Sequence, residues 1–261
     1  KVKTLRRTFR DCQALEYLDL SGWDLRHVGE TIGSTKGTMY YTFYGDKSLR
    51  TLEIGNGWNL QMCEDFESAF NGCSVLPGQD FGQMQVASPK NLNSTFRGCE
   101  SIIELDLRHW DLRSAVTLQM MFYQDANLEY IRMEENHWRL DNCTSLLMTF
   151  QGCGKLNQDF REISTSDKLT NIRDTFNGLS AVRKMDLRGF NTESVTECAG
   201  TFSGCTNLVT IYATVNFRIP TQYHSTSMFK DCRNLVGGNG TRYSNMGGTQ
   251  NNPRYAWLDG N

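Results

Sequence analysis

The chain of 261 residues carries 27 basic and 29 acidic side chains, a formal net charge of −2, and 39% hydrophobic residues. This length allows one large domain or two ordinary ones, and the apolar content is sufficient for a continuous core. The charges are interspersed, and no run of Lys and Arg is long enough to follow a phosphate backbone, so nucleic acid is not an expected partner. No apolar stretch reaches the length of about 18 residues that a membrane-spanning helix needs, so no transmembrane segment is expected.

A regularly spaced phenylalanine divides the chain into nine copies of a repeat, most of them 26 or 27 residues long. The residue six places after each phenylalanine is always Leu, Ile or Val, and the residue three places after it is Cys in six copies. A fixed period of this length is typical of a solenoid, in which similar coils stack on one another. The repeat phenylalanines are Phe9, Phe43, Phe70, Phe96, Phe122, Phe150, Phe176, Phe202 and Phe229.

Each copy is expected to contribute one short strand and one return leg. Apolar and polar residues alternate in Leu18–Leu20, Leu105–Leu107 and Met185–Leu187, which is the pattern of a strand with one buried face. The polar leg that leads to the next phenylalanine is expected to form a short helix or a tight helical turn. One unit cannot bury its own apolar face, so the units are expected to share a core and to align their strands in one parallel sheet. The predicted fold is an α/β, leucine-rich-repeat-like solenoid over residues 1–235.

Three segments depart from the repeat. An insertion rich in Gly and Thr separates the first two copies, and we expect Gly29 to Thr38 to form a projecting loop. The third and sixth copies have shorter, more polar strand segments, around Pro77 and Asn157. The phenylalanine pattern stops after residue 235, so residues 236–261 are expected to form a C-terminal cap of the same domain.

The nine cysteines allow three interpretations. Packing as small apolar core residues is favoured, because six of them share one repeat position. Disulfide bonds are the second interpretation, since an extracellular setting would permit them. A metal site is the least favoured, because the chain lacks paired Cys-x-x-Cys or His ligands, and no metal or cofactor is expected. The six that share one position are Cys12, Cys73, Cys99, Cys153, Cys205 and Cys232.

The repeat pattern MF-x-x-C-x-x-L-x-x-LDL-x-x-(F/W)-D-T-x-x-V-T resembles the BspA-like leucine-rich repeat surface proteins of bacteria. MFKDCRNLVGGNGTRY from Met228 resembles the final repeat of that family, YAWLDG near Asn261 resembles its closing segment, and LNQDF from Leu156 resembles a variant repeat. The chain departs from the pattern where Asp46, Asp125 and Leu179 replace the cysteine. The resemblance implies an extracellular or cell-surface protein that binds a host or environmental protein or glycan, and it brings no catalytic residues.

The outward residues of the strands are the candidate binding site. Residues two apart on a strand share a face, and stacking turns them into rows of carboxylates, guanidinium groups and tyrosines. Such a surface suits polar recognition, with Arg for carboxylates and Tyr for stacking. Tyr17, Tyr130 and Tyr212 are expected to lie in register. The candidate residues are Tyr17, Asp19, Glu53, Glu104, Asp106, Arg108, Tyr130, Arg132, Asp186, Arg188 and Tyr212.

We therefore expect a non-catalytic binding or adhesion module that uses the exposed face of the stacked sheet. An enzyme of the parallel β-helix kind, such as a polysaccharide lyase or hydrolase, is one alternative. It is disfavoured because Asp19, Asp106 and Asp186 recur at one strand position, which indicates a shared structural or surface role rather than one active centre. A structural spacer without a ligand is the other alternative.

Overall fold

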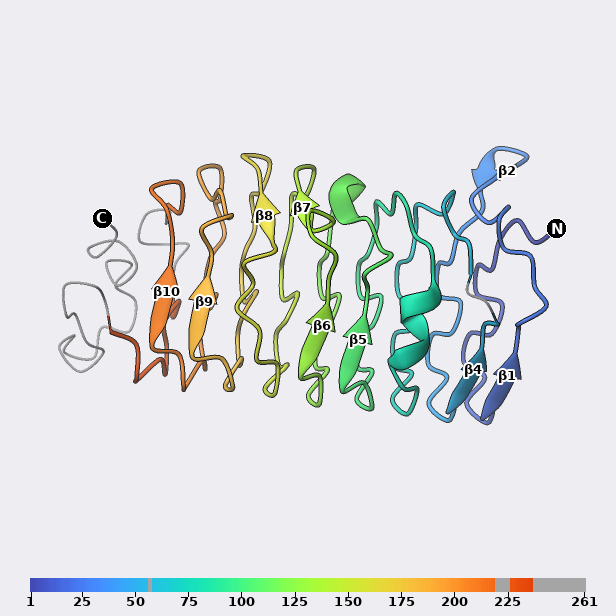
Figure 1. Ribbon diagram of the computed structural model, residues 1–261, viewed down its shortest axis with the longest axis horizontal. Coiled ribbons are helices and arrows are strands. Elements are labelled where there is room, and N and C mark those ends of the chain that lie inside the picture. Colours follow the sequence, from blue (N-terminus) through green and yellow to red (C-terminus); the bar gives the residue numbers. More distant parts are fainter. Residues whose placement is uncertain (56–57, 219–225, 237–261) are drawn as a thin grey trace.

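The computed structural model describes residues 1–55, 58–218 and 226–236, which form a solenoid of stacked coils that follow one another in chain order from β1 at one end to β10 near the other (Figure 1). Each coil contains one repeat phenylalanine, so the predicted leucine-rich-repeat-like solenoid is confirmed. Within the described residues, no helix is both long enough and apolar enough to cross a membrane.

Short parallel strands follow one side of the stack, and we call them the strand row. β1 pairs with β4, β5 with β6, and β9 with β10, always in parallel and in register. The row lies along the lower half of Figure 1 and consists of β1 (Tyr17–Asp19), β4 (Thr51–Glu53), β5 (Glu104–Asp106), β6 (Tyr130–Arg132), β9 (Lys184–Asp186) and β10 (Thr210–Tyr212).

The strand row is interrupted at the third and sixth coils, so the prediction of one continuous sheet is wrong. In the third coil the row is occupied by the 3-10 helix η1 (Gln79–Gln83) instead of a strand. Pro77, just before it, has no backbone N–H to donate to a sheet. In the sixth coil, the Gln158 side chain accepts the N–H of Ile131 at 3.1 Å, where a strand would offer a backbone carbonyl. These are the two copies whose strand segments are weakest in sequence.

The remaining sides of the coil are held by shorter ladders. β7 (Arg139–Leu140) pairs in parallel with β8 (Ser164–Thr165). A row of single parallel bridges runs without interruption through six coils on another side. This row joins Asp65, Asn91, Thr117, Ser145, Asn171 and Glu197. The coils are therefore connected through all sides, and the stack stays continuous where the strand row is broken.

The return legs are chains of turns, so of the two forms expected from the sequence, a short helix or a tight helical turn, the structure shows turns. Within the described residues the only helical segments are η1 and the three-residue 3-10 helix η2 (Leu112–Ser114). The backbone takes a left-handed conformation two residues before and two residues after each of the nine repeat phenylalanines, as at Met120 (φ 54°) and Gln124 (φ 65°) around Phe122. A right-handed helix cannot continue through such residues, because their backbone has the opposite hand.

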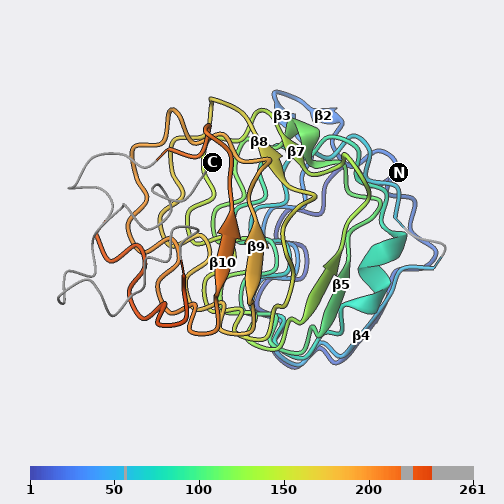
Figure 2. The same cartoon turned by 60° about the vertical axis from the view of Figure 1, so that its left-hand side comes forward.

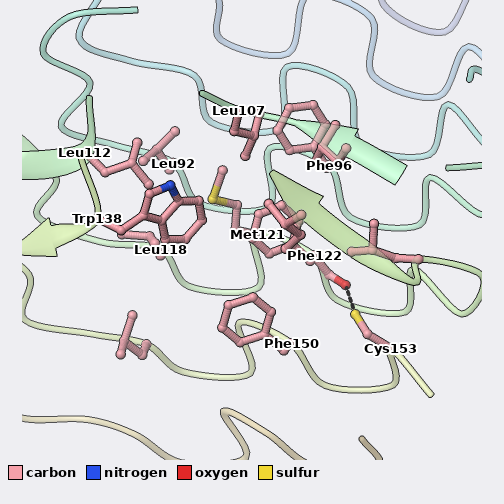
Figure 3. Close-up of a cluster of buried hydrophobic side chains, with 14 of the residues drawn as sticks. Leu92, Phe96, Leu107, Leu112, Leu118, Met121, Phe122, Trp138, Phe150 and Cys153 are labelled. Carbon is pink, nitrogen blue, oxygen red and sulfur yellow. Dashed lines mark hydrogen bonds between the residues drawn. The ribbon is translucent and has the colours of Figure 1, made fainter. Parts of the chain in front are cut away.

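The repeat phenylalanines form an aromatic stack along the centre of the solenoid. Neighbouring rings have centroids 5.2–6.0 Å apart, as for the pairs Phe43–Phe70 and Phe96–Phe122. Figure 3 shows part of this stack, with Trp138 and Met121 beside Phe122 and with Phe150 as the next ring. The continuous core that the apolar content predicted therefore lies inside the coils.

The cysteines at the shared repeat position are core residues, as the favoured interpretation predicted. None of the nine cysteines, all of which lie in the described residues, forms a disulfide bond, and Cys12 of the first coil is the exposed one. From the third coil on, each thiol at this position donates a hydrogen bond to the carbonyl of the phenylalanine in the preceding coil. Figure 3 shows this for Cys153 and Phe122, with Sγ 2.9 Å from the oxygen. The same contact is made by Cys73, Cys99, Cys205 and Cys232.

The insertion between the first two coils forms an antiparallel hairpin of β2 (Thr31–Ile32) and β3 (Thr35–Lys36). Its residues are exposed and it projects from the stack near the N-terminal end (Figures 1 and 2). The predicted projecting loop is therefore confirmed. Residues 237–261, which hold nearly all of the expected cap and the YAWLDG segment, lie outside the described residues.

Candidate functional site

Most of the candidate residues lie on the strand row, in two positions of each strand, whereas Arg108 and Arg188 come two residues after β5 and β9, and Asp186 is buried with an exposed fraction of 7%. The first position holds Tyr17, Thr51, Glu104, Tyr130, Lys184 and Thr210, and the third holds Asp19, Glu53, Asp106, Arg132, Asp186 and Tyr212. Tyr17 and Tyr130 share the first position, whereas Tyr212 lies in the third. The expectation that the three tyrosines lie in register is therefore wrong for Tyr212, because its strand position is shifted by two residues.

The recurring strand aspartate holds the turn that follows its strand. Asp106 Oδ1 accepts the backbone N–H of Arg108 at 3.1 Å, and the Arg108 guanidinium pairs with Asp106 Oδ2 at 2.7 Å. Asp186 and Arg188 repeat this arrangement, and Asp19 accepts the N–H of Ser21. The shared structural role that the recurrence indicated is therefore present.

These local contacts keep the strand carboxylates ionised. The side-chain hydrogen bond from Arg108 holds the pKa of Asp106 below its ordinary value, and Arg188 has the same effect on the pKa of Asp186. A hydrolase of the kind considered as an alternative needs one carboxyl with a raised pKa to donate a proton. The pKa values of Asp106 and Asp186 are instead lowered, so these carboxyl groups are poor proton donors.

The third-coil interruption leaves a hollow of about 560 Å³, the coil-three hollow, which is lined by residues that precede η1 and by residues of β5 and β6. Pro77 and Gly78 form one side of it, and a Cβ added to Gly78 would lie 2.3 Å from the carbonyl oxygen of Glu104. Here the backbone of the third coil presses against β5, which only glycine allows. The coil-three hollow is also lined by four of the candidate residues, Glu104, Asp106, Arg108 and Arg132.

Every charge of these four residues has a partner among them. Arg132 is ion-paired with Glu104 on the neighbouring strand, and Arg108 with Asp106 on its own. The coil-three hollow is therefore polar but internally neutral.

The sixth-coil interruption leaves a second hollow of about 620 Å³, the coil-six hollow, between β6 and β9. Tyr130 is the candidate residue that lines it, with an exposed fraction of 48%. The other lining residues are Asn157, Gln158, Asp159, Arg161, Glu162, Arg183 and Lys184. Sequence reasoning did not select these seven, although the weak strand of the sixth copy marked the place.

The charges of the coil-six hollow are only partly matched. Arg161 is paired with Asp159 at 2.7 Å. The side chains of Arg183 and Lys184 make no ion pair or hydrogen bond with any residue that the structure describes, and the same holds for Glu162. As far as the described residues go, two cations without an ion pair therefore face one unpaired carboxylate in this hollow.

The other candidate residues are spread along the molecule. Tyr17, Asp19 and Glu53 lie on β1 and β4, on the N-terminal side of η1, and Tyr212 lies on β10. Asp186 and Arg188 line neither hollow. Among the residues described, no three His, Cys, Asp or Glu side chains gather as metal ligands would.

A family model described as "Mycoplasma protein of unknown function, DUF285" matches residues 37–130 and 125–239, more than half of the chain. The chain belongs to the DUF285 family. DUF285 is a BspA-like repeat family, so the resemblance drawn from the repeat pattern is confirmed. The two matched stretches of this DUF285 protein include the strand row from β4 to β10 and both hollows.

Three solved structures are similar to this DUF285 chain. A leucine-rich repeat protein from Bacteroides ovatus is 14% identical, with 89% of this chain and 68% of that one covered and a TM-score of 0.36. A leucine-rich cell surface protein from Faecalibacterium prausnitzii is also 14% identical, with 80% and 68% covered and a TM-score of 0.35. TLR13, in its complex with ssRNA13, is 18% identical, with 86% and 35% covered and a TM-score of 0.29. No curated protein matches the chain in sequence.

Proposed function

We propose that this DUF285 protein is a non-catalytic recognition module at the cell surface or outside the cell, and that it binds its ligand on the outward face of the strand row. The observation that carries the proposal is the pair of hollows at the two strand-row interruptions. Both open on the face that the repeat pattern selected, and one of them gathers Glu104, Asp106, Arg108 and Arg132. A concave site with convergent polar groups on a rigid scaffold is the usual form of a binding site.

The composition of the face favours recognition over chemistry. Guanidinium groups and carboxylates are held by their neighbours in fixed positions, and large aromatic rings stand out from the strands. Tyr17, Tyr130 and Tyr212 have exposed fractions of 58%, 48% and 45%. Such rings supply contact area with little loss of conformational entropy on binding. A host or environmental protein or glycan is the class of ligand that this surface suits.

The structural spacer is the second candidate, and one observation favours it. The charges of the coil-three hollow neutralise one another. A face whose charges are already paired needs no ligand to be stable in water.

The test is binding of the purified chain to a panel of glycans and matrix proteins, compared with a face variant. The variant removes the outward side chains but replaces the two aspartates by asparagine, so that an oxygen still accepts the turn N–H. Its substitutions are Asp106→Asn, Arg108→Ala, Tyr130→Ala, Arg132→Ala, Asp186→Asn and Arg188→Ala. A control variant carries Arg113→Ala and Arg139→Ala, which remove exposed arginines paired with nearby aspartates away from the strand row.

We expect saturable binding of at least one panel member by the wild-type chain and by the control, and its loss in the face variant. Equal binding by all three chains would exclude the strand-row face as the site. No binding to any panel member would favour the spacer.

A further inference from the structure

We propose that the coil-six hollow binds an acidic saccharide, with Arg183 and Lys184 contacting its carboxylate and Tyr130 stacking on its sugar ring. This inference rests on the proposed function and names the ligand class of one of its two hollows. It starts from the two free cations described above, which distinguish this hollow from the internally neutral one at coil three.

The cations and the ring come from different coils and face one space. Tyr130 begins β6 on one side of the hollow, and Lys184 begins β9 on the other, with Arg183 directly before it (Figure 1). The polar segment of the sixth coil lies between them. An exposed aromatic ring opposite two cations matches the two parts of an acidic sugar, a C–H face and a carboxylate.

The backbone around the hollow closes the route that an extended peptide would use. The N–H of Ile131 is taken by the Gln158 side chain, and the N–H of Asp186 donates to the Asp159 carbonyl at 2.6 Å. The N–H of Asn157 donates to the Glu129 carbonyl at 3.1 Å. With these groups bonded, a peptide strand has no row of partners to pair with.

The lining also lacks the anchor that a folded protein partner would need. Tyr130 is its one large apolar side chain, and the remaining lining residues are polar or charged. Tight protein interfaces depend on apolar or aromatic anchors in desolvated pockets. Polar lining with one exposed ring and unpaired cations therefore favours a carbohydrate acid over a protein.

The test measures binding of a galacturonic acid tetrasaccharide to the full chain by calorimetry, beside its methyl ester, which has the same rings without charge. Sialyl oligosaccharide provides a second source of a sugar carboxylate, and a tetraglutamate peptide provides carboxylates without sugar. The key variant is Arg183→Gln with Lys184→Gln. Both side chains are exposed, so the fold is expected to persist, and a thermal melt checks it.

A matched control removes the same charge elsewhere. Lys47→Gln with Arg50→Gln also deletes two exposed cations, and Arg50 occupies in the second coil the repeat position of Arg183, seven residues after the phenylalanine. A second pair of variants tests the ring: Tyr130→Ala removes it and Tyr130→Phe keeps it.

We expect at least one of the two acidic saccharides to bind, with affinity at least about tenfold lower in the Arg183/Lys184 variant, since two charge-assisted contacts are lost. The Lys47/Arg50 control and Tyr130→Phe should bind as the wild type does, and Tyr130→Ala should bind more weakly. The binding should also weaken as salt is added.

Three results would overturn the assignment: equal binding of the methyl ester, equal or tighter binding of tetraglutamate, or equal loss in the Lys47/Arg50 control. A panel ligand lost in the face variant, together with no binding of either acidic saccharide, would overturn this inference and leave the proposed function standing.

Discussion

At the scale of single residues, the position three residues after the repeat phenylalanine shows how polar groups are accommodated in the core. Where it is cysteine, from the third coil on, the thiol satisfies a phenylalanine carbonyl of the preceding coil. Asp46 and Asp125 take the same position in the second and fifth coils and are fully buried. One oxygen of each accepts the backbone N–H of a cysteine, Cys12 at 2.7 Å and Cys99 at 2.8 Å. The other oxygen has no hydrogen-bond partner in the described structure, which makes the charged form costly.

Burial therefore raises the pKa of both carboxyl groups. The pKa of Asp46 rises from 3.8 to about 6, and the pKa of Asp125 also rises well above its ordinary value. The folded protein holds the Asp46 proton more tightly than the unfolded chain does. The contribution of this residue to the free energy of unfolding therefore falls as the pH rises from about 4 to about 6, and is constant above that range.

Asp46→Asn tests this sign. Asparagine keeps the oxygen that accepts the Cys12 N–H and has no charge to lose. We expect the variant to match the wild type near pH 4 and to exceed its free energy of unfolding by about 2 kcal/mol at pH 7. Urea denaturation of both chains at several pH values measures the difference, in which the other titrating groups cancel. A difference that does not change between pH 4 and pH 7 would contradict the assignment.

At the scale of the elements, the turns around the repeat phenylalanine are present in every coil, whereas the strands of the strand row are missing from two of the described coils. The position two residues after the repeat phenylalanine has a positive φ in all nine coils and holds glycine in six of them. The six are Gly45, Gly72, Gly98, Gly152, Gly178 and Gly204. That glycine column is visible in the sequence and marks left-handed backbone directly after the phenylalanine, through which a helix could not continue. The spaced apolar residues on the leg before each phenylalanine are compatible with either a short helix or a tight helical turn.

Gln124 occupies this left-handed position in the fifth coil with φ 65°. Because glycine adopts this backbone without a steric penalty, Gln124→Gly is expected to raise the free energy of unfolding by about 1 kcal/mol. Urea denaturation measures the change.

The reciprocal substitution Gly98→Gln provides the control. A Cβ on Gly98 would meet nothing closer than 4.0 Å, so its effect comes from the backbone alone, and we expect a loss of about the same size. Stabilisation by both substitutions, or by neither, would show that φ at this position does not limit stability.

At the scale of the whole molecule, the periodicity of nine phenylalanines was enough to predict the solenoid, and the weak third and sixth copies were enough to locate its interruptions. The chemistry of the hollows could not be predicted in the same way. Tyr130 and Arg183 come from coils that are not neighbours, and the hollow between them depends on how Gln158 bonds to Ile131. A repeat pattern gives the register of each coil, but it does not show which side chains surround the gap that a missing strand leaves.

Deleting residues 150–175 removes one whole coil, from one repeat phenylalanine to the residue before the next. Since coils contact mainly their neighbours, the shortened chain is expected to fold, with β6 beside β9 and the stack shorter by about 4.8 Å. Circular dichroism and small-angle scattering check the fold and the length. The coil-six hollow should be lost, and saccharide binding with it.

Deletion of residues 150–162 removes only half of a coil, so the remaining residues can no longer pair in register with the neighbouring coils. This shorter deletion is expected to yield an unfolded or aggregated chain. Should both deletions unfold equally, the coils would not be the interchangeable units that their contacts indicate.

Apart from the strand aspartates, such as Asp106 and Asp186, which hold the turn after their strand, the residues that stabilise each coil are separate from the residues that determine the chemistry of its outer face. The first and third strand positions take no part in the stack of phenylalanines or in the thiol hydrogen bonds. They are also separate from the residues with left-handed backbone and from the row of single parallel bridges. Those outward positions already range over tyrosine, threonine, lysine, glutamate, aspartate and arginine on one backbone. Substitutions at two residues per coil can therefore change the binding specificity of such a protein, while the backbone that carries these residues is unchanged.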